Sequence, residues 1–584
     1  MKRFFSFMKK KDVVLLGVGA LCLMMQVLFD FISPRYMSEM TENSSKMAAG
    51  VIEKGDVYYS QFMMLLCIVG SLFFSILAVF FVTKVAASFL ADIRLLMFKR
   101  IQLFSSKEID DLSLSSLITR MTIDVKTVQG DFITIFQSLI KVPVIIIWAV
   151  ISINRLGFRW TFIIIVTVLI LSIIVALVLR ASVPYFIKIP KINDSLNNEL
   201  LSKLSGTESL RAYNCNSLQS DILDQVNAEF VKENTNGQLT MAIMIPVINL
   251  IMNIMTATVF LVAADVFCFD PSYKMHEGVG QIMAFVPYSM QIGIAFMLVV
   301  ELVQRFPRFN EAILRMIEVI DKEIYFDKAP INKSKENPPK KPGSVEFRNV
   351  CFSYNEGGKN FISNVSFDIK PGETMAIVGG IGSGKTTIIN LLLRFFDPSS
   401  GLVLINGIDA RDYGKKELYK MFGFVPQKAV LFSDTIEHNI VYGDNEIDGE
   451  SRLQEVVYSA VLDDVLNRNG RDMSSHIAEN GKNFSGGQKQ RLSIARALAR
   501  DCDILVMDDP FSALDFITTK ELKNRIFEKY AKKTKIVVSQ RIAPIMDADK
   551  ILVLDKGEVV GLGSHDELID NCKVYKEIYL SQVR

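Results

Sequence analysis

Residues 379–386 have types and spacing that could bind the phosphates of a nucleotide. They read Gly379, Gly380, Ile381, Gly382, Ser383, Gly384, Lys385 and Thr386, which fits G-x-x-x-x-G-K-T, and Thr387 follows. Such glycines let successive backbone N–H groups converge on phosphate oxygens where a helix begins. Lys385 would reach the β- and γ-phosphates, and the Thr386 hydroxyl would bind magnesium. The spacing therefore predicts a phosphate-binding loop.

A second set of chemical groups follows about a hundred residues later. The apolar run 504–507 ends in Asp508, as expected of a buried strand that delivers one carboxylate to the magnesium ion. A strand ending in aspartate is common on its own. It gains weight here from the glycine loop upstream and from the segment Phe-Ser-Gly-Gly-Gln at 484–488.

The elements around the loop are those that a phosphate site requires. The pattern predicts a strand at 374–378 that runs into the loop and a helix over 385–396 behind it. Strand-rich segments come first in residues 345–584 and helix–strand alternation follows, so we expect an α/β P-loop nucleotide-binding domain. The Pro- and Lys-rich stretch 326–344 before it is expected to be a linker.

The first 325 residues predict an all-α membrane domain. Six apolar stretches are long enough to cross a bilayer as helices, near 13–32, 61–87, 132–153, 160–179, 241–267 and 281–303. The lysines and Arg3 before the first span predict a cytoplasmic amino terminus. The connections 88–131 and 180–240 are long and carry periodic charges, which favours helices that continue beyond the membrane. The fold class is a multidomain membrane protein with six spans followed by a cytoplasmic cassette.

Composition excludes several alternatives. The formal net charge of +2 over 584 residues points to no nucleic-acid partner. The seven cysteines are scattered and form no Cys-x-x-Cys pair, so neither a disulfide framework nor a zinc site is expected.

Taken in this order, the motifs resemble an ATP-binding cassette exporter of the multidrug type, a half-transporter with the type I exporter (type IV) fold. The resemblance covers nearly the whole chain and implies that ATP and Mg²⁺ are bound. It implies that Tyr354 stacks on adenine and that Gln427 contacts magnesium and couples to the membrane helices. Ser485, Gly486, Gly487 and Gln488 would cap ATP held by the opposite cassette, and Asp515 would lie in the loop between the two ATP sites.

Two residues depart from the family pattern. The position after the magnesium aspartate normally carries glutamate, whose carboxylate polarises the attacking water, but here it is Asp509. Its side chain is shorter by one methylene, or roughly 1.5 Å. The second departure is Gln540, which stands where the family has histidine and cannot carry a proton. None of the chain's four histidines falls at that position.

Together the departures resemble the degenerate ATP site of heterodimeric exporters. We therefore expect a different half-transporter as partner, with glutamate and histidine at these positions, while the intact Ser-Gly-Gly-Gln of this chain completes the partner's site. A homodimer would carry two impaired sites and is the less favoured alternative. Asp509, Gln540 and Gln427 are the candidate catalytic residues, and Thr386, Gln427 and Asp508 the candidate magnesium ligands.

The expected function is ATP-driven export of amphipathic or drug-like compounds across a plasma membrane, with a bacterial source favoured. Met283, Met290 and Met297 share a helix face that would suit an adaptable apolar cavity, although ordinary helix packing explains them equally well. Short coupling helices are expected near 112–116 and 212–219. Lipid or peptide translocation, or a regulatory subunit with negligible catalysis, are the alternatives.

Overall fold

The computed structural model describes residues 1–48, 54–154, 158–214, 216–269, 275–323, 342–354, 358–443, 450–467 and 470–583. They form two compact units, one of residues 1–102 with 112–322 and one of residues 103–111 with 323–584. Most of the predicted linker, 326–344, lies outside the described residues, which resume at residue 342.

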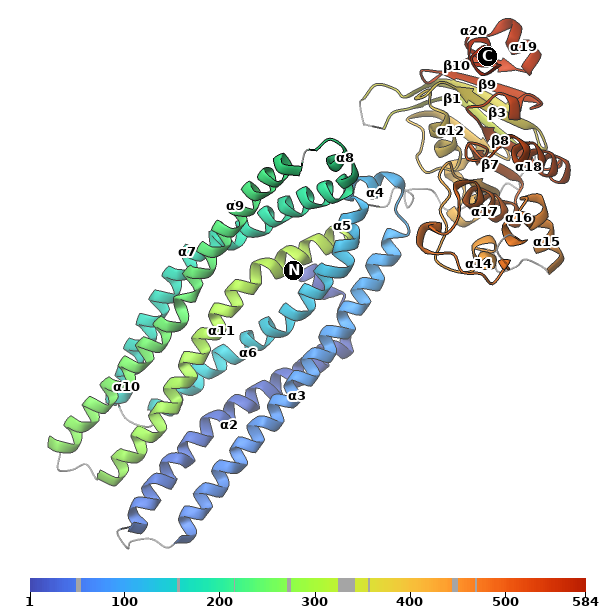
Figure 1. The fold of residues 1–584 in the computed structure, drawn as a ribbon. Helices are drawn as coiled ribbons and strands as arrows, with labels where there is room; N and C mark the ends of the chain where they lie inside the picture. The colour runs from blue at the N-terminus through green and yellow to red at the C-terminus, as the bar shows by residue number, and fades with distance from the viewer. Residues whose placement is uncertain are drawn as a thin grey trace. The chain divides into compact units, whose positions relative to one another are not determined.

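The described part of the first unit is helical throughout (Figure 1). Apolar segments in a bilayer must satisfy their backbone groups internally, which favours helices. The elements are α1 Lys2–Ser6, α2 Lys10–Ala48, α3 Lys54–Ile101, α5 Leu114–Thr119, the π-turn η1 Arg120–Asp124, α6 Val125–Asn154, α7 Phe158–Ser205, α8 Thr207–Ala212, α9 Asn216–Ala242, α10 Met244–Phe269 and α11 Met275–Asp321.

The six predicted spans are confirmed. The described residues contain six helical stretches long and apolar enough to cross a membrane: Lys10–Met47, Lys54–Ile101, Leu114–Asn154, Trp160–Ile189, Gln219–Ala264 and Ile282–Asp321. The helices also continue well past the apolar segments, as the charged periodic connections predict: α3 runs to Ile101 and α7 to Ser205.

Small residues allow the long helices to approach one another closely. A Cβ on Gly19 of α2 would lie 3.1 Å from Val82 Cγ2 on α3, and one on Gly293 of α11 would lie 3.4 Å from Met252 Cγ on α10. Close backbone approach of this kind is typical of helix packing in membranes. Around the outer ends, Phe31, Ala149 and Phe285 belong to one buried cluster that joins α2, α6 and α11.

Short helices lie at or next to both segments where coupling helices are expected. Around 112–116, α4 covers Ser106–Leu112 and α5 begins at Leu114, and before 212–219, α8 ends at Ala212. Residues 103–111, which include most of α4, belong to the second compact unit, where the Lys415 ammonium donates a hydrogen bond to the Leu103 carbonyl (3.3 Å).

The second unit contains two sheets built from β1 Val345–Phe352, β2 Ile362–Ile369, β3 Thr374–Gly379, β4 Ser400–Ile405, β5 Ile408–Asp409, β6 Phe422–Val425, β7 Ile504–Asp508, β8 Thr534–Val538, β9 Lys550–Asp555 and β10 Glu558–Gly563. The antiparallel sheet has the order β2-β1-β4-β5. The second sheet has the order β10-β9-β3-β8-β7-β6, parallel except for the edge strand β10. This arrangement confirms the predicted α/β domain.

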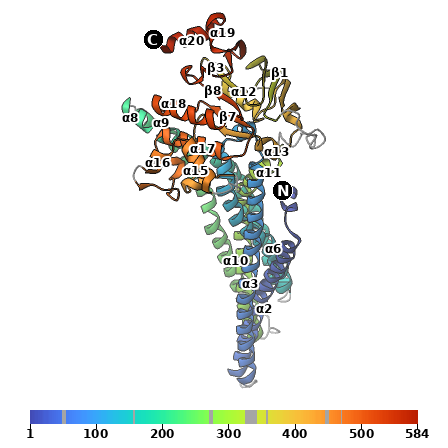
Figure 2. The ribbon, with the colours of Figure 1, turned by 90° about the vertical axis from the view of Figure 1, so that its right-hand side faces the viewer.

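Helices cover the parallel sheet, and α15, α16 and α17 gather together away from β1 (Figure 2). The helical elements are α12 Lys385–Leu392, η4 Ala410–Asp412, α13 Lys415–Lys420, α14 Ile436–Ile440, α15 Glu450–Ser459, α16 Asp463–Asn467, η6 Glu479–Gly481, α17 Gly486–Ala499, α18 Phe516–Lys529, η7 Ala543–Ile545, α19 His565–Asn571 and α20 Lys573–Val583.

The helix predicted over 385–396 is too long by four residues, because α12 ends at Leu392. Arg394 adopts a left-handed backbone conformation with φ of 54°, which a continuing α-helix does not allow. Its buried guanidinium binds Asp397 (3.0 Å) and the Ala410 carbonyl (3.2 Å). These tertiary contacts hold the turn that stops the helix.

Candidate nucleotide-binding site

Four neighbouring parallel strands deliver the predicted site residues to one edge of the sheet. β3 leads into the glycine loop 379–386, β7 ends at Asp508 and is followed by Asp509. β6 is followed by Gln427 and β8 by Gln540. Because these strands run in the same direction, their carboxyl ends meet, and that edge is where open α/β sheets bind ligands.

These residues line a single pocket with a volume of about 220 Å³. Its walls are Phe361, Ile381, Gly382, Ser383, Gly384, Lys385, Thr386, Thr387, Gln427, Asp508, Asp509, Val538 and Gln540. The structure thus brings together the predicted loop, the two aspartates and the two glutamines. Gly379 and Gly380 form the base of the same loop, because Lys385 folds back onto their carbonyl groups.

The glycine loop has the shape of a phosphate cradle. Gly384, the residue before α12, has φ of +103°, and a Cβ there would lie 2.5 Å from Ile362 Cδ1. A Cβ at Gly379 would lie 2.3 Å from the Leu554 carbonyl oxygen. A Cβ at Gly380 or Gly382 would meet no atom within 4 Å, and both residues are exposed. The loop and the start of α12 therefore fit a phosphate group.

Lys385 is buried, and its ammonium donates hydrogen bonds to the carbonyl oxygens of Gly379 (2.9 Å) and Gly380 (2.7 Å). Burial lowers the pKa of Lys385, while the nearby carboxylates of Asp508 and Asp509 raise it in opposition. The ammonium is therefore hydrogen-bonded to the loop, within reach of an anion bound there.

Three oxygen ligands suited to magnesium face this pocket. Asp508 is buried at the end of β7, and the Thr386 hydroxyl donates a hydrogen bond to its carboxylate. Burial raises the pKa of Asp508, and the Thr386 bond opposes that shift. Gln427 adds an exposed amide. Carboxylate, hydroxyl and amide oxygens are hard donors that suit Mg²⁺, which commonly takes its other ligands from phosphates and water.

Asp509 lines the pocket, but its backbone and carboxylate are both engaged by the neighbouring segment. Its carboxylate accepts a hydrogen bond from the backbone N–H of Gln540, and its own N–H donates to the Val538 carbonyl (3.0 Å). Asp509 is only 6% exposed and has φ of 48°, an uncommon value for a residue with a side chain. Burial raises its pKa, and the Gln540 bond opposes that rise. The short carboxylate therefore lies against the segment that follows β8.

Gln582 of α20 holds the Gln540 segment from outside the pocket. Its amide donates to the Gln540 carbonyl (2.7 Å) and accepts from the Ile542 N–H (2.8 Å). Sequence reasoning missed this residue, because nothing in a C-terminal helix marks a glutamine as a partner of a loop 42 positions away.

Replacing Gln582 by leucine should loosen this segment. Each lost hydrogen bond is worth about 1 kcal/mol, so backbone amides over 540–542 should exchange roughly fivefold faster with deuterium. Hydrogen-exchange mass spectrometry measures this directly. The control is Glu577→Leu, an exposed residue of the same helix; equal exchange in both variants would contradict the assigned contact.

Tyr354 belongs to an aromatic cluster beside the pocket. Its ring meets Phe352, Phe361 and Phe396 edge-on at centroid distances of 4.8, 5.5 and 5.4 Å. Its hydroxyl lies 3.0 Å from the Thr387 hydroxyl. Phe361, which sequence reasoning missed, lines the pocket directly and is 40% exposed. Both rings offer an aromatic surface for a base to stack on.

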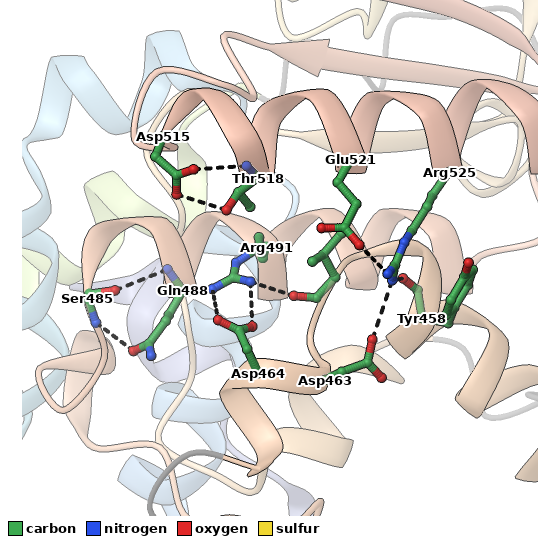
Figure 3. A network of polar contacts seen from close by, with 11 residues as sticks. Tyr458, Asp463, Asp464, Ser485, Gln488, Arg491, Asp515, Thr518, Glu521 and Arg525 are labelled. Carbon is green, nitrogen blue, oxygen red and sulfur yellow. Dashed lines mark hydrogen bonds and ion pairs between the residues drawn. The ribbon is translucent and has the colours of Figure 1, made fainter.

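The Ser-Gly-Gly-Gln segment lies at the start of α17 and does not line this pocket (Figure 3). Ser485 and Gln488 form a reciprocal cap: the Ser485 N–H donates to Gln488 Oε1 (3.0 Å) and the Gln488 N–H to Ser485 Oγ (3.4 Å). Asp515 caps α18 in a similar way through Thr518. A Cβ at Gly487 would lie 3.0 Å from the Ala513 carbonyl oxygen, so the two helix starts pack closely.

Arg491 ties this signature helix to α16 (Figure 3). Its buried guanidinium donates to both carboxylate oxygens of Asp464 (2.6 and 3.2 Å) and to the Val461 carbonyl (2.5 Å). The preceding aspartate, Asp463, is 53% exposed and contacts Arg525 at 3.4 Å.

Asp464→Ala should therefore destabilise the cassette by about 1–3 kcal/mol, because it strips a buried guanidinium of its counter-charge. The figure allows for the 39% exposure of the Asp464 side chain. Asp463→Ala is the matched control and should change stability by about 0.5 kcal/mol or less. Thermal unfolding of the two variants separates them; equal melting temperatures would argue against the role of Arg491.

Comparisons with known proteins agree with this geometry. Residues 16–300 match the family described as ABC transporter transmembrane region, and residues 362–512 match the family ABC transporter. The chain is 30% identical over 524 residues to the uncharacterized ABC transporter ATP-binding protein Mb1304c of Mycobacterium bovis, covering 88% of this chain and 86% of that protein. It is 29% identical over 588 residues to the uncharacterized ABC transporter ATP-binding protein YfiB of Bacillus subtilis, covering 100% and 98%.

A solved structure shares the fold over its whole length. It is described as a bacterial Atm1-family ABC exporter with ATP bound, and it superposes with a TM-score of 0.83 over 99% of both chains at 21% sequence identity. One assignment agrees with the six spans, with the phosphate-binding loop on a parallel sheet and with relatives that match over most of their length. This chain belongs to the ABC transporters, as an exporter half-transporter with one transmembrane domain and one ATP-binding domain.

Proposed function

We propose that this chain is the half of a heterodimeric ABC exporter that carries the weakly hydrolysing ATP site. The observation that carries the proposal is the position of Asp509, a carboxylate one methylene shorter than glutamate that is drawn to the backbone N–H of Gln540. A general base has to lie within hydrogen-bond reach of the proton that it takes. With its carboxylate engaged and one methylene short, Asp509 meets that requirement poorly.

Gln540 supports the same proposal. Its side chain is exposed at the pocket, and its amide can donate a hydrogen bond to a phosphate oxygen but cannot become cationic. The residues that would bind phosphate and Mg²⁺ match the family pattern: Lys385, Thr386 and Asp508 all line the pocket. Bound Mg²⁺ would neutralise charge on the phosphates, with Thr386, Asp508 and Gln427 as its protein ligands. The pocket therefore favours holding ATP over cleaving it.

The signature segment supports a competent site elsewhere. Its reciprocal cap leaves the Ser485–Gln488 helix start well formed and away from this chain's own pocket, so it is free to face a nucleotide bound by another cassette. Two cassettes closing on ATP would then open the outer side of the membrane domains, and hydrolysis in the partner's site would reset them. We assign residues 1–325 to the membrane domain, 326–344 to the linker and 345–584 to the cassette.

The membrane helices support an amphipathic substrate. Met283 and Met290 of α11 are 40% and 62% exposed. Met297, on the same face, joins Met241 and Met244 in a pocket of about 240 Å³ that also carries the polar ends of Glu301 and Gln304. Flexible thioethers next to a few polar groups suit varied amphipathic molecules. We place the exporter in a bacterial plasma membrane with its cassette in the cytoplasm.

Affinity capture tests the heterodimer. The chain is tagged and produced together with the protein encoded beside it, and the membrane fraction is captured on the tag. A one-to-one complex whose ATPase activity disappears when the partner's catalytic glutamate is replaced would support the proposal. Capture of two copies of this chain, with full activity, would refute it. Transport that survives Lys385→Ala in this chain would instead favour a regulatory subunit.

A further inference from the structure

The methionine-lined pocket of the membrane helices carries one charged side chain. Its volume is about 240 Å³, and its described lining residues are Met241, Met244, Ile245, Ile248, Met297, Val300, Glu301 and Gln304. Among these, only Glu301 is charged, while the others offer aliphatic carbon, thioethers and one amide. Met241 and Met244 are buried, so this apolar wall belongs to the packed interior of the helices. The pocket therefore suits an apolar body whose polar end meets a carboxylate.

Glu301 lies near one end of the apolar segment 281–303. It is the only charged residue of that segment and stands two residues before its end. The polar headgroup region of a bilayer begins where the apolar part of a span ends. A carboxylate there lies at the level of an amphiphile's headgroup, while the pocket walls can take up its apolar part. Ionisable residues in spans commonly mark substrate or ion pathways.

The Glu301 carboxylate is paired with Arg305, one turn further along α11. The Arg305 Nε donates a hydrogen bond to Glu301 Oε1 (3.0 Å), and Nη2 lies 3.0 Å from the same oxygen. The two side chains are 41% and 36% exposed. Ion pairs of this kind, four residues apart on an exposed helix face, contribute little free energy. A cation from outside the chain can therefore replace Arg305 at a small cost.

Arg305 has a second counter-charge on a different helix. Its Nη1 donates to Oδ1 of Asp131 on α6 (2.9 Å), and the Asp131 side chain is only 2% exposed. Arg308 also binds Asp131, with its Nη2 at 3.1 and 3.2 Å from the two carboxylate oxygens. A charge left without a partner away from water is costly. Because Asp131 remains in contact, Arg305 avoids that cost when it releases Glu301.

We propose that Glu301 binds the cationic group of amphipathic substrates by displacing Arg305, which stays paired with Asp131. The proposal deepens the export function proposed above and rests on it. An anionic headgroup meets Glu301 as a like charge, and a neutral headgroup gives nothing in return for the broken ion pair. The flexible methionine side chains adapt to apolar parts of different shape. The charge of the headgroup, more than the shape of the apolar part, then decides which amphiphile binds.

The test uses the assembled transporter in lipid nanodiscs and three amphiphiles with the same decyl chain. Their headgroups are trimethylammonium, sulfate and maltoside, and each is kept below the concentration at which it forms micelles. The measured quantity is the concentration that gives half-maximal stimulation of ATPase activity. Each variant is compared with the wild type on the same compound, so that partitioning of the compound into lipid cancels.

The two partners of the ion pair should shift the response in opposite directions. Glu301→Gln should raise the half-maximal concentration of the trimethylammonium compound about tenfold, because its charged partner is lost. The same variant should lower the value for the sulfate, since the like charge is gone, and leave the maltoside within about twofold. Arg305→Gln should lower the value for the trimethylammonium compound about threefold, because the guanidinium no longer competes for Glu301.

Glu311→Gln is the matched control. Glu311 lies on the same helix and pairs with Arg315 four residues later (3.2 Å) at a similar exposure of 45%, but it does not line the pocket. It should leave all three values within about twofold. Shifts of the same sign in Glu301→Gln and Arg305→Gln, or an equal shift in Glu311→Gln, would overturn the inference alone. No stimulation of the wild-type transporter by any of the three compounds would overturn the proposed export of amphiphiles as well.

Discussion

The double replacement Asp509→Glu/Gln540→His should raise ATP hydrolysis at this chain's own site about 100-fold, because a well-placed general base is worth about 10²–10⁴ in rate. The added methylene carries the carboxylate roughly 1.5 Å further, past the Gln540 N–H that now holds Asp509. An imidazole at position 540 can carry the proton that an amide cannot. Either change alone should give a smaller gain.

Single-turnover hydrolysis of bound ATP measures this effect without interference from slow steps in transport. The matched control is Asp501→Glu/Gln454→His, which makes the same chemical changes at exposed positions of the cassette. It should leave the rate unchanged. If the site variant hydrolyses no faster while it binds ATP normally, then reach and proton transfer do not limit this site.

Lys385→Ala should weaken ATP binding at this site by about two orders of magnitude. A hydrogen bond to a charged group is worth about 1.5–3 kcal/mol, and the ammonium can give up its bonds to Gly379 and Gly380 for phosphate oxygens. Equilibrium binding of a fluorescent ATP analogue tests this. Lys482→Ala, an exposed lysine of the same unit, is the control. An affinity within twofold of the wild type would show that the loop binds phosphate without its lysine.

The parts of the site that are local in sequence were predictable. The strand before the loop, the start of α12 at Lys385 and the carboxylate at the end of β7 follow from residue spacing, because each depends on neighbours in the chain. The six spans follow from hydropathy for the same reason. The end of α12 could not be predicted in this way. It depends on contacts of Arg394 with Asp397 and Ala410, and helix propensities contain no information about such contacts.

The groups that sequence reasoning missed depend on contacts between distant segments. Phe361 reaches the pocket through the packing of the antiparallel sheet, and Gln582 reaches Gln540 across 42 positions. The sequence did identify Asp509 and Gln540 as unusual. Only the fold shows that the carboxylate of one accepts the backbone N–H of the other.

The most direct test of the central idea is the ATPase rate of this chain purified without any second half-transporter. We expect the unmodified chain to bind ATP with Mg²⁺ but to hydrolyse it far more slowly than the same chain carrying Asp509→Glu/Gln540→His. Fast hydrolysis by the unmodified chain, abolished by Asp509→Asn, would contradict the account and make Asp509 a competent base.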